Sequence, residues 1–78
     1  SSMDRVQVFL RSPLFTTRSN GHVPSKTAII EGTVVETQGA GLQIQVTAWR
    51  NADGAPLEGE PRTLFIPPSK IDHVWLLD

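Results

Sequence analysis

The chain has 78 residues, a formal net charge of −1 and no cysteine, which limits it to one small domain without disulfides or thiolate metal sites. A charge this close to neutral excludes a strongly basic nucleic-acid binder, and the lack of a long apolar run excludes a membrane-spanning helix. The two histidines, His22 and His73, lie far apart in the sequence, so we expect neither a metal site nor another cofactor.

The first residues give an expectation about processing and location. Ser1 and Ser2 precede Met3 and are interpreted as a cloning remnant, which leaves residues 3–78 as a single domain. No charged and then apolar leader opens the chain, and we therefore expect a cytoplasmic protein. A domain this small buries only about 60% of the surface that its unfolded chain exposes, so a partner subunit would add needed stability.

A first strand is predicted at residues 6–10, VQVFL, because β-branched and aromatic residues favour strands. Ser, Thr, Asn, Gly and Pro are frequent in residues 11–26, which indicates a long loop. Leu14 and Phe15 are the apolar residues expected to pin this loop to the body of the domain. The hydroxyl groups of the loop and Arg18 could contact phosphate, although a solvated loop has the same composition.

Two longer strands follow. In residues 27–36, TAIIEGTVVE, Gly32 indicates a bend, a bulge or a close crossing of another backbone. The glycines of the next turn, TQGAG, are interpreted as turn residues. Residues 42–49, LQIQVTAW, alternate in hydrophobicity, so Ala48 is predicted to face the core and Trp49 to face outward. Trp49 would then either stack on a ligand or pack on a cross-strand neighbour.

The last third of the chain predicts a loop, a strand, a corner and a final strand. Residues 50–61 have the composition of an extended hairpin loop with a solvated tip, and residues 62–66, RTLFI, form the return strand. Two prolines then favour a single 3₁₀ turn at residues 68–70, before a last strand in residues 70–78. Because five short strands cannot cover a flat sheet, we expect an all-β, strongly bent, five-stranded SH3-like or Sm-like barrel that closes on itself.

The sequence gives little reason to expect catalysis. Asp72 and His73 are adjacent, but neighbours in a regular strand point to opposite faces, so they cannot form an acid–base pair unless the strand breaks there. No Ser, His and Asp set occurs at a diagnostic spacing. We therefore predict a protein that is not an enzyme.

The strand pattern resembles the Sm/Lsm/Hfq-like small β-barrel family over residues 27–77. The shared features are the glycine-bent strand EGTVVE, the uninterrupted strand after it, and a corner with Ile66, Ile71 and Val74 at the family's spacing. The resemblance implies a ring in which the fourth strand of one subunit pairs with the last strand of the next. It also implies single-stranded RNA bound at loops that face the pore of the ring.

The loops depart from the family pattern. Gln38 and Leu42 stand where the family has an Asp and, four positions later, an Asn, and Pro67–Pro68 replace an Arg-Gly pair. Gln38 could hydrogen-bond a base and Lys70 could neutralise a phosphate. The candidate RNA-binding residues are Gln38, Gly39, Gly41, Ser69 and Lys70.

The final strand is unusually apolar. Val74 and Leu76 are predicted to face the interior, while Trp75 and Leu77 face outward, and an exposed apolar edge requires a cover. Either the 11–26 loop covers it within one molecule or the next subunit of a ring does. The candidate interface residues are Leu64, Phe65, Val74, Trp75, Leu76 and Leu77.

Together these patterns predict a non-enzymatic Sm-like protein that assembles into a homo-oligomeric ring and binds single-stranded RNA or a protein partner through its loop faces. The alternative is a monomeric SH3-like adaptor that binds a peptide or protein in an aromatic-lined groove.

Overall fold

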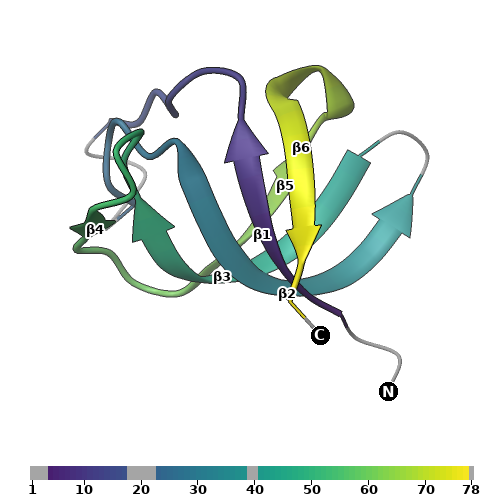
Figure 1. The fold of residues 1–78 in the computed structure, drawn as a ribbon. Coiled ribbons are helices and arrows are strands. Elements are labelled where there is room, and N and C mark those ends of the chain that lie inside the picture. Colours follow the sequence, from purple (N-terminus) through teal and green to yellow (C-terminus); the bar gives the residue numbers. More distant parts are fainter. Residues whose placement is uncertain (1–3, 18–22, 39–40, 78) are drawn as a thin grey trace.

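The structure is a computed structural model that describes residues 4–17, 23–38 and 41–77. Its six strands, shown in Figure 1, are β1 (Arg5–Leu10), β2 (Ile29–Gln38), β3 (Gly41–Arg50), β4 (Pro56–Leu57), β5 (Arg62–Ile66) and β6 (Ile71–Leu76). The 3₁₀ turn η2 (Pro68–Lys70) joins β5 to β6, as the two prolines predict. The all-β prediction is confirmed. Within the described ranges, no helix is both long and apolar enough to cross a membrane.

The strands form one antiparallel sheet in the order β4-β3-β2-β1-β6, and β5 pairs with β3 beside β4. Figure 1 shows β2 and β3 bending strongly along their lengths. Within the described residues β5 and β6 do not pair, so the sheet stays open and has one strand more than expected. β5 pairs with β3 on one side of the sheet, and β6 pairs with β1 on the other side. The short turn η2 connects β5 to β6.

The pairing of β2 with β3 is irregular around the glycine of β2, Gly32. The pairing with β3 shifts register on both sides of Gly32, between Glu31 and Gly32 and between Val34 and Glu36. A Cβ atom at Gly32 would collide with the backbone carbonyl of Gln45 on β3. The predicted close approach of two backbones is therefore confirmed, and it explains why glycine is needed here.

The first of these shifts also moves Trp49 to the core. Glu31 pairs with Ala48 but Gly32 pairs with Val46, so β3 has one extra residue between them and its side-chain alternation changes there. Trp49 is only 2% exposed, and its Nε1 donates a hydrogen bond to the carbonyl of Glu60 at 3.2 Å. The predicted outward position of Trp49 is wrong, and it offers no stacking surface.

The core lies inside the bent sheet and is built from β1, β2, β3 and the end of β5. Its buried members are Val6, Val8, Leu10, Ile30, Ile44, Val46, Trp49 and Ile66. β6 contributes only partly buried side chains, Ile71 and Val74. The last strand is therefore attached to the body mainly by its pairing with β1.

Candidate functional site

The two unpaired sheet edges, β5 and β6, are the most unusual feature of the described structure. Each strand has a partner on one side only, β3 for β5 and β1 for β6. The same segment of the chain exposes large apolar side chains: Phe65 is 60% exposed, Trp75 59% and Leu76 71%. An unpaired edge with apolar side chains is a template for pairing with another strand.

Strand pairing assigns the side chains of β6 to two faces. Val74 pairs with Val8 and packs against the core, and Leu76, two residues further, belongs to the same face by alternation. Leu76 pairs with the buried Val6 but is itself largely exposed, so its predicted burial in the interior of its own subunit is wrong. The physical reason is the open sheet, since within the described residues no strand pairs with the other side of β6. Trp75 is exposed as predicted.

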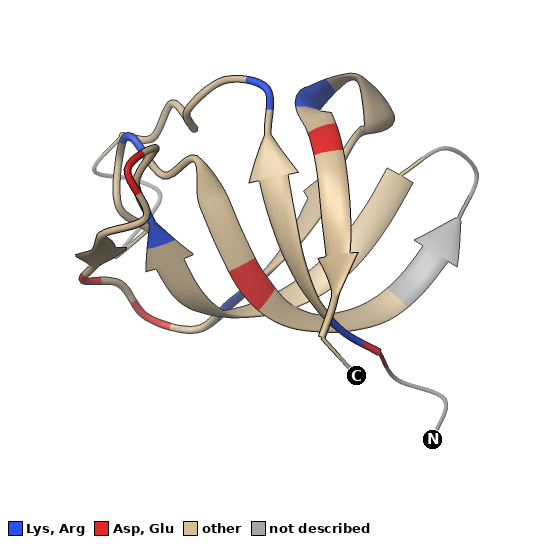
Figure 2. Cartoon of the chain, in the orientation of Figure 1, with Lys and Arg blue, Asp and Glu red and all other residues tan. Residues whose placement is uncertain are grey.

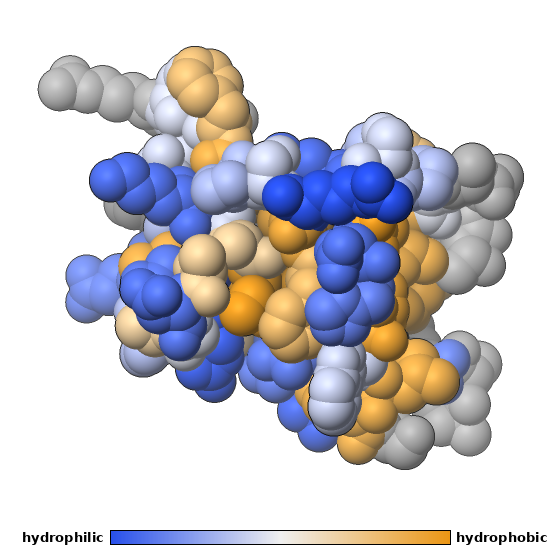
Figure 3. Space-filling model, turned by 45° about the horizontal axis from the view of Figure 1, so that its top comes forward, coloured by the Kyte–Doolittle hydropathy of each residue, from blue (hydrophilic) through white to orange (hydrophobic). Residues whose placement is uncertain are grey.

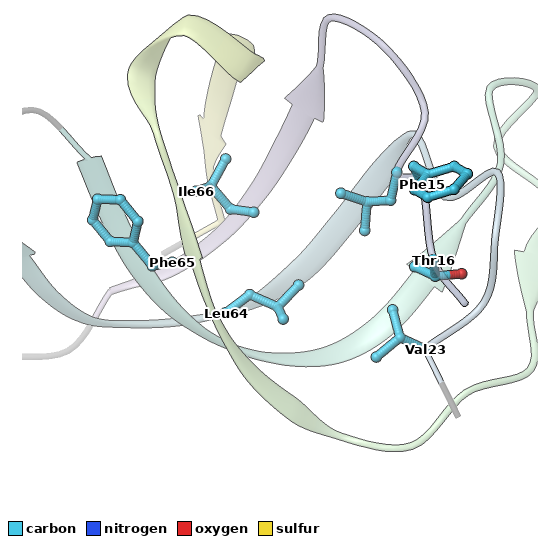
Figure 4. Close-up of a pocket in the computed structure, with 7 residues that line it drawn as sticks. Phe15, Thr16, Val23, Leu64, Phe65 and Ile66 are labelled. Carbon is cyan, nitrogen blue, oxygen red and sulfur yellow. The ribbon is translucent and has the colours of Figure 1, made fainter. Parts of the chain in front are cut away.

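β5 also has two distinct faces. Leu64 is half-buried and Ile66 is buried, while Phe65 between them points to the other side, as Figure 4 shows. A Cβ atom at Gly41 would collide with the Phe65 ring, so this glycine is buried beneath an aromatic side chain. Gly41 therefore makes room for Phe65.

An apolar hollow of about 180 Å³ lies between β5 and the 11–26 loop (Figure 4). Its lining is Leu14, Phe15, Thr16, Val23, Leu64, Phe65 and Ile66, which includes no charged residue. On the face shown in Figure 3, apolar side chains gather in a central area bordered by hydrophilic ones. The chemistry of the hollow favours an apolar side chain over a charged ligand.

Hydrogen bonds near Thr27 join the two ends of the loop to each other. The Leu14 amide donates to the Thr27 carbonyl at 2.8 Å, and Thr27 Oγ1 donates to the Pro24 carbonyl at 2.8 Å. Leu14 packs against the core, as predicted. Phe15 is 90% exposed, so the prediction that it anchors the loop to the body is wrong. The described part of the loop lies beside β5 and leaves Trp75 exposed, so it is not the intramolecular cover of β6 that we considered.

Lys70 connects the start of this loop to the η2 corner. Its Nζ donates to Ser12 Oγ at 2.9 Å and to the Pro13 carbonyl at 3.2 Å. Arg11 adds a second link, because its Nε donates to the Ile71 carbonyl at 3.1 Å. Two of the three N–H donors of Lys70 are thus used within the described part of the molecule.

The structure brings the strand ends that flank the two predicted RNA-contacting loops to one end of the sheet. Leu42 pairs with Ile66, so the start of β3 lies next to the end of β5, which leads into the corner that carries Ser69 and Lys70. Gly39 lies outside the described residues, and only the backbone of Gln38, which pairs with Gly41, is described. Figure 2 shows basic and acidic residues interspersed along the described part of the chain.

Asp72 and His73 do contact each other, contrary to the expectation for a regular strand. Phe9 pairs with His73 but Leu10 pairs with Ile71, so Asp72 is the extra residue of a β-bulge. The bulge re-aims the side chains and brings His73 Nδ1 to 2.6 Å from Asp72 Oδ2. The His73 ring stacks on the Phe9 ring, with 4.3 Å between the ring centroids. The side chains of His73 and Asp72 are each about half exposed to solvent.

The described residues contain no cluster of metal-ligating side chains.

Comparison with known protein-family models, curated proteins and solved structures finds no match to this chain.

Proposed function

We propose that this chain is a non-enzymatic, Sm-like small β-barrel protein that assembles into a ring of identical subunits. In the ring, β5 of one copy pairs with β6 of the next. The main support for the proposal is that β5 and β6 each have an unpaired side in the same open sheet and expose large apolar side chains. Because the two edges differ, their contact is head-to-tail, and repeating such a contact with a closing rotation gives a ring.

Several details of the fold support the Sm-like assignment. β2 bends along its length (Figure 1) and approaches the backbone of β3 closely at Gly32, and β3 is a single strand from Gly41 to Arg50. Ile66, Ile71 and Val74, the three residues of the corner, all belong to the core or pack against it. The order β6-β1-β2-β3-β5 leaves free the same two strands that the family resemblance assigns to the subunit interface.

The energetics also favour association. Burying one large apolar side chain contributes roughly 1.5–3 kcal/mol, and Phe65, Trp75 and Leu76 all have much of their surface left to bury. Pairing of the two edges would also satisfy backbone groups of both strands. An aromatic residue at the centre of such a contact is the usual anchor of a protein interface.

The oligomeric state tests this proposal directly. We expect light scattering and native mass spectrometry of the full chain at micromolar concentration to give one defined multiple of the subunit mass. A monomer at this concentration would contradict the ring.

A ring would bring together several copies of the sheet end where β2 ends, β3 begins and the η2 corner lies. We propose this end as the contact for single-stranded RNA, with the remaining donor of Lys70 directed to phosphate. Titration with oligo-U and oligo-A at two salt concentrations tests this part separately. No affinity for either oligonucleotide at low salt would exclude RNA and leave a protein partner as the ligand of the loop faces.

The second candidate function is a monomeric SH3-like adaptor. The hollow beside β5 favours it, because an apolar cavity next to an unpaired strand suits an extended peptide with one apolar anchor. A monomeric chain that binds peptides through this hollow would support the adaptor and exclude the ring.

A further inference from the structure

We propose that Arg11 and Lys70 form a clamp that binds one backbone phosphate of single-stranded RNA between the end of β1 and the η2 corner. The inference rests on the proposed RNA contact at this end of the sheet. It deepens that contact, because it adds Arg11, which lies outside the predicted RNA-binding residues, and because it states what each group of the clamp does.

The fold brings the two cations of the clamp together. The end of β1 and the η2 corner lie side by side, and basic residues are found at both places (Figure 2). Leu10 pairs with Ile71, and one residue further the Arg11 amide donates to the Lys70 carbonyl at 2.8 Å. Arg11 therefore lies opposite Lys70, and residues that are opposite each other in a strand pair project their side chains to the same face.

The hydrogen bonds that hold these two side chains do not neutralise them. Arg11 Nε donates to the Ile71 carbonyl at 3.1 Å. Lys70 Nζ donates to Ser12 Oγ at 2.9 Å and to the Pro13 carbonyl at 3.2 Å. All three acceptors are uncharged, so the two positive charges lie close together without a carboxylate in these contacts. An anion is the ligand that such a pair of charges attracts.

The carboxylates of the neighbouring segments bond elsewhere. Oδ2 of Asp72, the acid next to the corner, lies 2.6 Å from His73 Nδ1. At the other end of β5, Arg62 has a carboxylate partner of its own, because its Nη2 lies 3.6 Å from Glu60 Oε1. Arg11 and Lys70 together exceed Asp72 by one positive charge, which is the charge that a phosphodiester neutralises.

The side chains of the clamp keep donors for a phosphate. Among the described residues the Arg11 side chain bonds only through Nε, so its two Nη groups form a planar fork that matches two phosphate oxygens. Ser12 Oγ accepts its hydrogen bond from Lys70, which leaves the hydroxyl hydrogen of Ser12 to donate. Because these side chains are already held in place, phosphate binding costs little additional side-chain entropy.

An aromatic pair beside the clamp favours a nucleic acid over a free phosphate. Phe9 lies two residues before Arg11, so both side chains belong to the same face. The Phe9 ring stacks on the His73 ring at 4.3 Å between centroids, and the side chain of His73 is 48% exposed. An exposed aromatic ring next to a cationic phosphate contact is the combination that binds the bases and the backbone of single-stranded RNA.

The first test measures binding of labelled oligo-U and oligo-A to the full chain by fluorescence anisotropy at several salt concentrations. We expect Arg11→Gln to lower the affinity for both oligonucleotides by roughly fivefold to tenfold, and equally, since a phosphate contact carries no sequence information. The slope of the logarithm of the binding constant against the logarithm of the salt concentration should fall by about 0.7, the value for one lost phosphate contact on a single strand.

Arg62→Gln is the matched control. It makes the same substitution at the start of β5, whereas the η2 corner follows the end of β5, so affinity and salt slope should stay at the wild-type values. Lys70→Gln removes the other cation of the clamp and should have the same two effects as Arg11→Gln, so the clamp is tested even if one variant fails to fold. Circular dichroism and native mass spectrometry check the fold and the assembly of each variant.

Arg11→Lys separates the charge of Arg11 from its geometry. Lysine keeps the positive charge but lacks the fork, so the salt slope should stay at the wild-type value while the affinity falls less than in Arg11→Gln. A salt slope reduced as much as in Arg11→Gln would contradict a charge contact at this position.

The outcomes separate the clamp from the proposed RNA contact. A wild-type chain without affinity for either oligonucleotide at low salt would overturn both. Wild-type affinity and salt slope in Arg11→Gln would leave the RNA contact standing and overturn the clamp. Displacement of oligo-U by millimolar inorganic phosphate at constant ionic strength would assign the clamp to free phosphate and overturn its role in binding RNA.

Discussion

The body of the domain and its two free edges are opposite in character. In the body, β1, β2 and β3 pair on both sides, and Val8, Ile30 and Ile44 are fully buried. At the edges, β5 and β6 each pair on one side, and the apolar residues Phe65 and Trp75 are exposed. The comparison shows that the two strands with an unpaired side, β5 and β6, also expose large aromatic side chains. For this reason we propose that the body determines folding and that the edges serve association.

The two tryptophans give the strongest test of this division, and Trp49 represents the body. Trp49→Ala should lower the free energy of unfolding by about 3–5 kcal/mol, because it removes a buried side chain and leaves a cavity. Urea denaturation at a fixed protein concentration measures the loss. Trp49→Phe keeps most of the packing but removes the hydrogen bond to Glu60, so it should cost clearly less. Equal effects of the two variants would argue against burial as the main contribution of this side chain.

Trp75 represents the edges. Trp75→Glu should weaken association by at least about 2 kcal/mol, because it places a charge at the centre of the proposed contact. Native mass spectrometry should show monomers, and circular dichroism should show an intact β fold. Val35→Glu is the matched control, since it introduces the same charge at an exposed apolar position outside both edges. An unchanged mass for Trp75→Glu would remove β6 from the interface.

A substitution at Gly32 tests how much the close approach of β2 and β3 contributes to the stability of the body. Gly32→Ala should cost about 1–3 kcal/mol of stability, because the added Cβ collides with the backbone of β3. Gly54→Ala is the comparison at a glycine that is constrained by its backbone conformation and not by close neighbours. Its φ of 88° disfavours alanine, but nothing lies within 4 Å, so we expect a smaller cost of about 1 kcal/mol. Thermal and urea unfolding would show whether this order is correct.

Lys70 joins the body to the loop beside the β5 edge. Lys70→Met keeps the apolar stem but removes the two hydrogen bonds to Ser12 and Pro13, and should cost about 1 kcal/mol or less because both are exposed. The loss should appear as faster hydrogen exchange at the start of the loop, with little change in β3. Equal acceleration in both regions would contradict a local role for this lysine.

Local sequence patterns predicted much of the fold. The β-branched runs predicted β1, β2, β3, β5 and β6, and the adjacent prolines predicted the η2 turn, because both signals depend on backbone preferences of a few residues. The glycine in EGTVVE indicated the close crossing at Gly32 for the same reason. The exposed Trp75 followed from alternation along an unbroken part of β6.

Long-range pairing decided what these patterns missed. The extra residue in β3 buries Trp49, and the bulge in β6 brings Asp72 to His73, yet a bulge is a property of two paired strands and leaves no mark in either strand alone. The short strand β4, the position of the 11–26 loop beside β5, and the open sheet likewise depend on which segments meet in space.

By itself, then, the sequence determined that the chain is all-β, where its main strands lie and where it must bend, since those properties are local. Only the tertiary structure decided which faces are buried and which edges stay free. A single residue inserted in the register between two strands reverses every side chain beyond it, and no local pattern records that insertion.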